Sequence, residues 1–185
     1  MSYKTILDQQ QLNLVIDRLC QQLLENHSSF EETLLIGLQP RGIYLAQRIH
    51  DSLENLLNKK VPLGELDITF HRDDFRRRDI PLRPNKTNIP FIIEDKSVVL
   101  VDDVLFTGRS VRSALDAMIT FGRPKKVELL VLVDRKYARH LPIAPDYVGL
   151  PVNTIASQHV SANWREQGAT NDLIWLSDKN EDPND

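Results

Sequence analysis

Apolar residues recur every three or four positions in three segments of the chain. The first passes through Leu12, Val15, Ile16, Leu19, Leu23 and Leu24, the second through Ile43, Ala46, Ile49, Leu53, Leu56 and Leu57, and the third runs from Val111 to Phe121. This spacing places apolar side chains on one face of a helix. It predicts three amphipathic helices, the first capped by Asp8 and the third ended by Gly122 and Pro124.

Short apolar runs separate these helices and predict β-strands. The runs are Leu34 to Ile36, Leu66 to Phe70, Val98 to Val101, Val127 to Val133, and two weaker ones at Tyr147-Val148 and Ile174 to Leu176. Strands that alternate with helices are typical of a parallel sheet. We therefore expect an α/β fold with a central parallel sheet flanked by helices. In such folds, ligands bind at the carboxyl ends of the strands.

Residues 71–90 break this pattern. The segment is rich in basic residues, contains three prolines and lacks apolar periodicity. Twenty residues is long for a plain connection within a compact domain. We expect a flexible loop over about residues 71–90, able to close over a nearby site as a lid.

Composition and charge are those of an ordinary soluble domain. Hydrophobic residues make up 41% and charged residues 26% of the 185 residues, and the net charge is −3. The segment 178–185 accounts for that net charge, so the rest is neutral, which argues against broad, non-specific nucleic-acid affinity. We expect one domain over residues 1–177 and a disordered acidic tail over residues 178–185.

Cysteine usage and the absence of long apolar runs favour a cytoplasmic protein. Cys20 is the only cysteine and lies among leucines, so we expect a buried thiol and no internal disulfide. The first ten residues are polar and lack the apolar core of a signal peptide. No apolar run approaches the roughly 20 residues of a membrane span.

The strongest chemical signal follows the apolar run Val98 to Val101. Two adjacent carboxylates, Asp102 and Asp103, end this run, and the small-residue turn 107–110 precedes the third helix. Paired carboxylates can address sugar hydroxyls or a hydrated metal ion, and backbone N–H groups at a helix start can hold a phosphate. The alternative, a plain acidic turn, is disfavoured because adjacent like charges at a buried strand end repel each other. The glycine patterns of a P-loop and of a dinucleotide-binding turn are both absent.

Val98 to Ser110 resembles the phosphoribosyl-pyrophosphate (PRPP) signature of type I phosphoribosyltransferases. Further stretches resemble one subfamily of them, PyrR, whose members are pyrimidine operon attenuators and also uracil phosphoribosyltransferases. These stretches are Ile36 to Leu45, Asp67 to Phe75, Val98 to Leu115, Gly122 to Pro124, Leu132 to Arg135 and Leu141 to Gly149. The resemblance covers roughly residues 5–177. It implies a type I phosphoribosyltransferase fold, with residues 71–90 as the flexible loop and a small hood built from the N- and C-terminal segments.

The resemblance also implies roles for residues. Asp102 and Asp103 match the acids that hold the ribose hydroxyls and help to seat Mg²⁺, which binds mainly through PRPP and pyrophosphate. They and the following residues match the cradle for ribose and the 5-phosphate. That cradle comprises Val104, Leu105, Phe106, Thr107, Gly108, Arg109 and Ser110.

Three further positions match pyrophosphate- and base-binding residues of the family. Pro40 and Arg41 match the pyrophosphate loop, where relatives often have a cis peptide and carry Thr instead of Pro40, and Arg72 is a candidate from the flexible loop. Arg135 matches a catalytic residue near the base and pyrophosphate, and Val160 falls in the hood, where backbone groups read uracil. Simple alternatives remain: a strand-to-helix turn at Pro40, a solvated charged loop at Arg72 and a surface arginine at Arg135.

The resemblance implies two activities: formation of UMP from uracil and PRPP, and nucleotide-responsive binding of pyr leader mRNA. Arg18, Lys136, Arg139 and His140 are compatible with the RNA role. However, Asp17 and Gln21 stand where Thr and His are expected, and Asp17 would repel phosphate. Alternatives are a purine phosphoribosyltransferase on the same fold and an RNA regulator with only residual catalysis. The family implies a homodimer or homotetramer.

Overall fold

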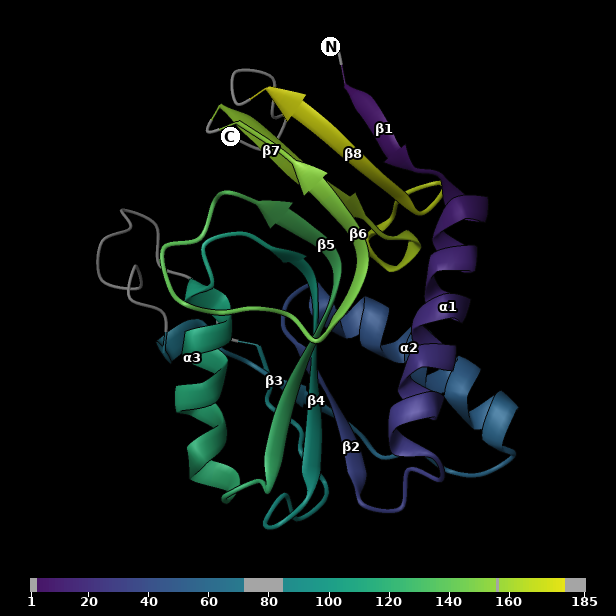
Figure 1. The fold of residues 1–185 in the computed structure, drawn as a ribbon, viewed down its shortest axis with the longest axis vertical. Helices are drawn as coiled ribbons and strands as arrows, with labels where there is room; N and C mark the ends of the chain where they lie inside the picture. Colours follow the sequence, from purple (N-terminus) through teal and green to yellow (C-terminus); the bar gives the residue numbers. More distant parts are fainter. Residues whose placement is uncertain (1–2, 72–84, 156, 179–185) are drawn as a thin grey trace.

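The computed structural model describes residues 3–71, 85–155 and 157–178. Its centre is a five-stranded sheet in the order β3-β2-β4-β5-β6, in which every neighbouring pair is parallel (Figure 1). The strands are β2 (Thr33–Leu38), β3 (Leu63–Leu66), β4 (Ser97–Leu105), β5 (Lys126–Lys136) and β6 (Tyr147–Asn153). The predicted α/β fold with a central parallel sheet is confirmed.

Helices cover both faces of this sheet. Helices α1 (Gln9–His27) and α2 (Gly42–Leu57) pack on one face, and α3 (Arg109–Met118) packs on the other (Figure 1). Alternate residues of β4 explain the two cores, because Val99 and Val101 face α1 and α2 while Val98 and Leu100 face α3. Strands buried on both faces read as continuous apolar runs, as the sequence does here.

The predicted helix boundaries agree closely with the structure. Asp8 caps α1, and its side chain accepts a 2.8 Å hydrogen bond from the backbone N–H of Gln11, whose own side chain accepts from the Asp8 backbone N–H. The segment predicted as the third helix divides into α3 and a 3-10 turn, η2 (Ile119–Phe121), before Gly122. Cys20 is fully buried, and burial raises the pKa of its thiol to about 12.

A second, antiparallel sheet lies above the carboxyl ends of the central strands (Figure 1). Its order is β1-β8-β7, with β1 (Lys4–Leu7), β7 (Gln158–Asn163) and β8 (Leu173–Asp178), and a 3-10 turn, η3 (Arg165–Gln167), lies between β7 and β8. The two ends of the described chain therefore meet in one small sheet. We refer to this sheet as the hood.

One predicted strand is wrong. Leu66 to Phe70 was expected to be extended, but the strand is β3, and Thr69–His71 forms a 3-10 turn, η1. The reason is Asp67, whose Oδ1 accepts hydrogen bonds from the backbone N–H and the hydroxyl of Thr69 at 3.0 and 2.6 Å. A side chain that bonds the backbone two residues ahead turns the chain and ends the strand.

Parts of the predicted loop and tail lie outside the described residues, namely 72–84 and 179–185. The end of the loop segment returns to the sheet, where Asn88 forms an antiparallel bridge with Glu65. Within the described ranges, no helix is long and apolar enough to cross a membrane.

Candidate active site

The two predicted acids lie at the carboxyl end of β4, between β2 and β5. Asp103 is only 4% exposed, and Asp102 is half-buried. Asp102 Oδ1 accepts a 2.9 Å hydrogen bond from the backbone N–H of Asp103, and Asp103 Oδ1 accepts a 2.8 Å bond from that of Val104. These bonds fix both carboxylates beside the backbone and leave their remaining oxygens for other partners.

The turn after β2 brings a cation to these acids. The Gln39–Pro40 peptide is cis, as expected, and Arg41 follows it. Arg41 Nε lies 3.3 Å from Asp103 Oδ2, an ion pair without hydrogen-bond geometry. Gly42 makes this approach possible, since a Cβ there would lie 2.6 Å from the carbonyl oxygen of Val101.

Among the described residues, Arg41 is the one cation that forms an ion pair with the two adjacent acids. Burial, and then the charge of Asp103, raise the pKa of Asp102 well above its usual value, although Arg41 acts in the opposite direction. Asp103 Oδ2 accepts no hydrogen bond from the described residues. Hydroxyl groups of a bound ligand would donate hydrogen bonds to these carboxylates, and a hard cation would favour their charged forms.

The residues fit a magnesium ion only if other ligands complete its coordination. The described residues contain no group of three or more His, Cys, Asp or Glu side chains arranged to hold a metal ion by themselves. Asp102 and Asp103 would supply the protein side of the site, and phosphate oxygens and water the rest, which is how Mg²⁺ is usually bound.

The predicted phosphate cradle is a turn between β4 and α3. Gly108 adopts φ of +89° at the N-cap of α3, a left-handed conformation that favours glycine. Arg109 begins the helix, and its backbone N–H lies 3.4 Å from Thr107 Oγ1. Val104 and Leu105 still belong to β4, so they can offer mainly backbone groups. A left-handed residue before a helix N-terminus gathers N–H groups that suit an anion.

Arg135, near the end of β5, joins this turn to the hood. Its guanidinium carbon lies 3.9 Å from the centre of the Phe106 ring. Its Nε donates to Thr154 Oγ1 at 3.1 Å, and its Nη2 donates to the Gln158 carbonyl oxygen at 2.8 Å. The residue is 2% exposed, and burial lowers its pKa. The Phe106 side chain is thus a platform for Arg135.

Two further residues, Val160 and Arg72, were predicted to contact a ligand. Val160 lies on β7, an edge strand of the hood, with its side chain buried in the core next to α1 and α2, so only its backbone can face a ligand. Arg72 lies outside the described residues.

Comparison with known proteins agrees with this architecture. Residues 2–167 match the phosphoribosyl transferase domain family. The bifunctional protein PyrR of Desulfosudis oleivorans is 46% identical over 156 residues, covering 84% of this chain and 86% of the relative. That of Enterococcus faecalis is 39% identical over 181 residues, covering 98% and 100%. The chain belongs to the PyrR family of phosphoribosyltransferases.

Solved structures share the fold of this PyrR-family chain at much lower identity. The hypoxanthine phosphoribosyltransferase of Trypanosoma cruzi aligns with a TM-score of 0.70 at 14% identity, covering 95% of this chain and 97% of that one. The Staphylococcus aureus enzyme aligns with a TM-score of 0.69 at 16% identity, covering 92% and 90%. The predicted type I phosphoribosyltransferase fold is confirmed, whereas these likenesses say nothing about which base is used.

Three of the four RNA candidates in this PyrR-family chain direct their charged groups to internal acceptors. Arg18 donates to the carbonyl oxygens of Val148, at 3.4 Å, and of Gly149 on β6. Lys136 Nζ lies 2.6 Å from Asp134 Oδ2, and Arg139 pairs with Asp134 Oδ1. The fourth, His140, has an exposed side chain.

Sequence reasoning missed the residues that support the cis-proline turn. Gln39 Nε2 donates to Glu65 Oε2 and to the Lys86 carbonyl oxygen, both at 2.9 Å. This amide links the turn before Arg41 to β3 and to the end of the loop segment. No spacing rule predicts it, because the three groups are far apart in the sequence.

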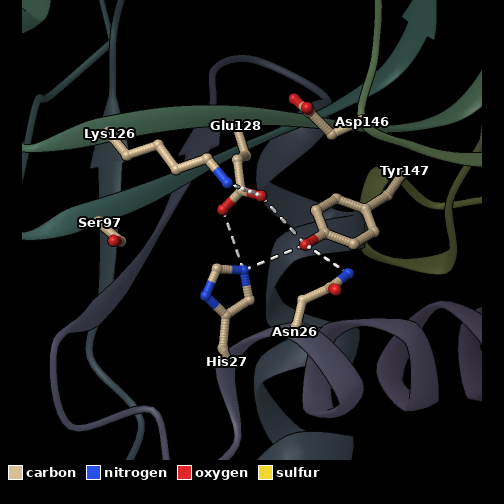
Figure 2. Close-up of a pocket in the computed structure, with 7 residues that line it drawn as sticks. All are labelled: Asn26, His27, Ser97, Lys126, Glu128, Asp146 and Tyr147. Atoms are coloured by element: carbon tan, nitrogen blue, oxygen red, sulfur yellow. Dashed lines mark hydrogen bonds and ion pairs between the residues drawn. The ribbon is translucent and has the colours of Figure 1, made fainter.

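A polar cavity of about 360 Å³ lies at the opposite, amino end of the sheet. Figure 2 shows His27, Tyr147, Glu128 and Lys126 converging there, with Asn26 beside the tyrosine. His27 Nε2 lies 3.1 Å from both Glu128 Oε2 and the Tyr147 hydroxyl. Lys126 Nζ lies 2.8 Å from Glu128 Oε1. These groups contact one another, so we assign this cluster to the structure of the protein and not to catalysis.

Proposed function

We propose that this protein transfers the phosphoribosyl group of PRPP to uracil, giving UMP and pyrophosphate. The proposal rests on the adjacent Asp102–Asp103 pair facing Arg41 beside a left-handed phosphate turn, in a chain of the PyrR family. In the reaction, the bond from ribose C1 to the pyrophosphate oxygen breaks, and a bond from C1 to a uracil nitrogen forms. The proton of that nitrogen leaves with the solvent or the pyrophosphate.

The acids act on the sugar in this proposal. Asp102 and Asp103 accept hydrogen bonds from the two ribose hydroxyls and lie near the ring as positive charge develops at C1. Buried carboxylates stabilise such charge more strongly than they would in water. The magnesium ion, when bound with PRPP, supplies positive charge to the departing pyrophosphate.

Cations of the chain act on the leaving group. Arg41 is 43% exposed in its side chain and so can reach pyrophosphate while its Nε stays near Asp103. Residues 106–110 hold the 5-phosphate, and Arg135 orders that turn through Phe106. The uracil then lies below β7 of the hood, where the backbone around Val160 is the candidate reader of its polar edges. The loop arginines, including Arg72, are further candidates for pyrophosphate.

A PRPP-dependent assay with uracil, hypoxanthine, guanine and orotate side by side tests this assignment. We expect turnover with uracil and its dependence on Mg²⁺. Turnover of hypoxanthine without turnover of uracil would overturn the proposal in favour of a purine enzyme.

The family name favours a second role, nucleotide-responsive binding of pyr leader mRNA, which regulates pyr gene expression. The relatives are named bifunctional, and His140 offers an exposed basic side chain beyond the end of β5. A mobility-shift titration with leader RNA at low and high salt tests it, with UMP as the effector. We expect a salt-sensitive shift, because RNA affinity rests largely on phosphate contacts. Absence of a shift at low salt would leave catalysis as the sole role.

We further propose a cytoplasmic location and a homodimer or homotetramer as the working form. The buried free thiol of Cys20 suits a reducing compartment. Light scattering during size-exclusion chromatography measures the assembly.

A further inference from the structure

The carbonyl groups that precede the phosphate turn are all held by one short segment, residues 139–141. Arg139 Nη1 donates to the carbonyl oxygen of Leu105 at 3.3 Å and to that of Phe106. The backbone N–H groups of His140 and Leu141 donate to the Thr107 carbonyl oxygen at 3.0 and 3.2 Å. Three consecutive peptide groups of the proposed 5-phosphate cradle therefore have their orientation fixed from the same side.

This orientation determines where the N–H groups point. In a planar trans peptide, the C=O and N–H bonds point in opposite directions. The only cis peptide among the described residues is Gln39–Pro40, so the peptides after Leu105, Phe106 and Thr107 are trans. Because their carbonyl oxygens face residues 139–141, the N–H groups of the following residues face the other side. That is the side from which a phosphate approaches the start of α3.

Arg139 is itself fixed by three other contacts. Its Nη2 pairs with Asp134 Oδ1, its Nη1 also donates to the Arg135 carbonyl oxygen at 3.2 Å, and its Nε donates to that of Ile143 at 3.1 Å. Asp134 is fully buried, and Lys136 lies at its second oxygen. Nη1 has two hydrogens for three carbonyl oxygens, so one N–H is shared between two acceptors. A planar guanidinium has donors on three nitrogens in fixed directions, whereas a lysine ammonium has them on one nitrogen and cannot reach all of these acceptors.

Packing supports the same arrangement. The left-handed Gly108 lies against this segment, since a Cβ at Gly108 would be 3.3 Å from Ile143 and 3.5 Å from Leu141. The Arg139 guanidinium and the side chains of Leu141 and Ile143 thus lie together behind the turn.

We propose that Arg139 is a positioning residue for PRPP: it orients the 5-phosphate turn through the carbonyl oxygens of Leu105 and Phe106. It does not touch the substrate. This inference rests on the proposed function, and it gives Arg139 a role at the PRPP site where RNA contact was the expectation.

The test is PRPP binding by calorimetry with Mg²⁺ and without any base. We compare wild-type protein with Arg139→Ala and Arg139→Lys, and use Arg112→Ala as the control. Arg112 lies on α3, pairs with Asp116 at 3.3 Å, and has a side chain 53% exposed. Because no base is present, the result is independent of whether uracil is the acceptor.

We expect Arg139→Ala to weaken PRPP binding by at least about tenfold, because the peptide groups of the turn are no longer held in the orientation that binds phosphate. In turnover, the PRPP KM should rise far more than the uracil KM. Arg139→Lys should fall between wild type and Arg139→Ala, and Arg112→Ala should match wild type. Added guanidinium at low millimolar concentration should restore part of the PRPP affinity of Arg139→Ala, whereas sodium should not.

Two results would overturn the proposal. One is PRPP affinity within about twofold of wild type in a folded Arg139→Lys or Arg139→Ala protein. The other is loss of leader-RNA binding with unchanged PRPP affinity. If Arg139→Ala does not fold, Arg139→Lys alone decides, because it keeps the charge beside Asp134 but cannot bridge the two carbonyl oxygens.

Discussion

Buried carboxylates occur at both ends of the central sheet, but their surroundings differ. At the amino end, Glu128 Oε1 accepts from the Tyr147 hydroxyl at 3.3 Å and lies 2.8 Å from Lys126 Nζ, while Oε2 lies 3.1 Å from His27 Nε2 (Figure 2). Three side chains of the protein therefore serve one carboxylate. Oε2 accepts no hydrogen bond from the described residues, so Lys126 and the Tyr147 hydroxyl at Oε1 are the groups that compensate this carboxylate.

At the carboxyl end, two adjacent carboxylates share one arginine among the described residues. Arg41 lies 3.3 Å from Asp103, and its contribution does not prevent the pKa of Asp102 from rising. A buried charge without a full set of partners costs stability. Among the described residues, two carboxylates face one cation at the carboxyl end, whereas one carboxylate faces Lys126 at the amino end. The larger excess of negative charge therefore lies where a ligand can supply cations and hydroxyl groups.

The largest expected effect comes from neutralising the acids. We expect Asp103→Asn to lower kcat/KM by about 10³-fold or more, because charge stabilisation at the reacting carbon is lost. Asp102→Asn should also lose activity while raising the melting temperature of the ligand-free protein, since it removes a carboxylate whose charged form is disfavoured. Steady-state kinetics and calorimetric melting measure the two quantities. A lower melting temperature for Asp102→Asn would break the comparison.

The matching change at the amino end should affect stability and leave activity alone. Glu128→Ala leaves His27, Lys126 and Tyr147 without their common acceptor, and we expect a loss of about 3 kcal/mol in the free energy of unfolding. Glu128→Gln keeps an acceptor oxygen and should lose less. Urea unfolding gives the free energies, and kcat/KM at 25 °C should stay within about twofold of wild type. A large rise in the PRPP KM would show that this end also contributes to the site.

In contrast to Glu128, replacing Arg41 should affect substrate binding and leave stability almost unchanged. We expect Arg41→Met to raise the PRPP KM by about tenfold or more, because a cation at the pyrophosphate position is lost. The melting temperature should change little, since a half-exposed ion pair contributes only about 0–1 kcal/mol. Arg41→Lys keeps the charge and should be intermediate in KM. If Arg41→Met instead unfolds readily and binds PRPP normally, the pair with Asp103 is structural.

Much of the fold follows from local pattern. The apolar periodicity and the Asp8 cap locate α1, and the continuous apolar runs locate β2, β4 and β5. The hood strands β1 and β7 were not predicted, because they are short, contain polar residues and gain their partner, β8, from distant sequence. In such strands, pairing decides the conformation more than local propensity does.

In the candidate site, too, neighbouring residues are predictable from the sequence, and contacts between distant residues are not. The acids and the glycine turn are contiguous, so the sequence predicts them together. The support of that turn by Arg139 depends on its reach across 33 residues to Phe106, and the His27–Glu128 contact spans 101 positions. Neither contact has a characteristic spacing. For Arg139, a basic residue after a strand is equally compatible with RNA contact, and only the fold shows which acceptors it meets.

The two ends should also respond to pH with opposite signs. Burial lowers the pKa of His27 from 6.5, so below pH 6.5 the unfolded chain binds this proton more strongly and acidification destabilises the protein. Burial raises the pKa of Asp102 from 3.8, so above pH 3.8 the folded protein holds the proton more strongly and acidification stabilises it. In urea unfolding between about pH 5 and 7, His27→Gln should flatten the rise of stability with pH, and Asp102→Asn should steepen it. Each slope can change by at most about 1.4 kcal/mol per pH unit, the value for one proton. Slopes that shift in the same direction would show that the two ends do not differ in the way their contacts indicate.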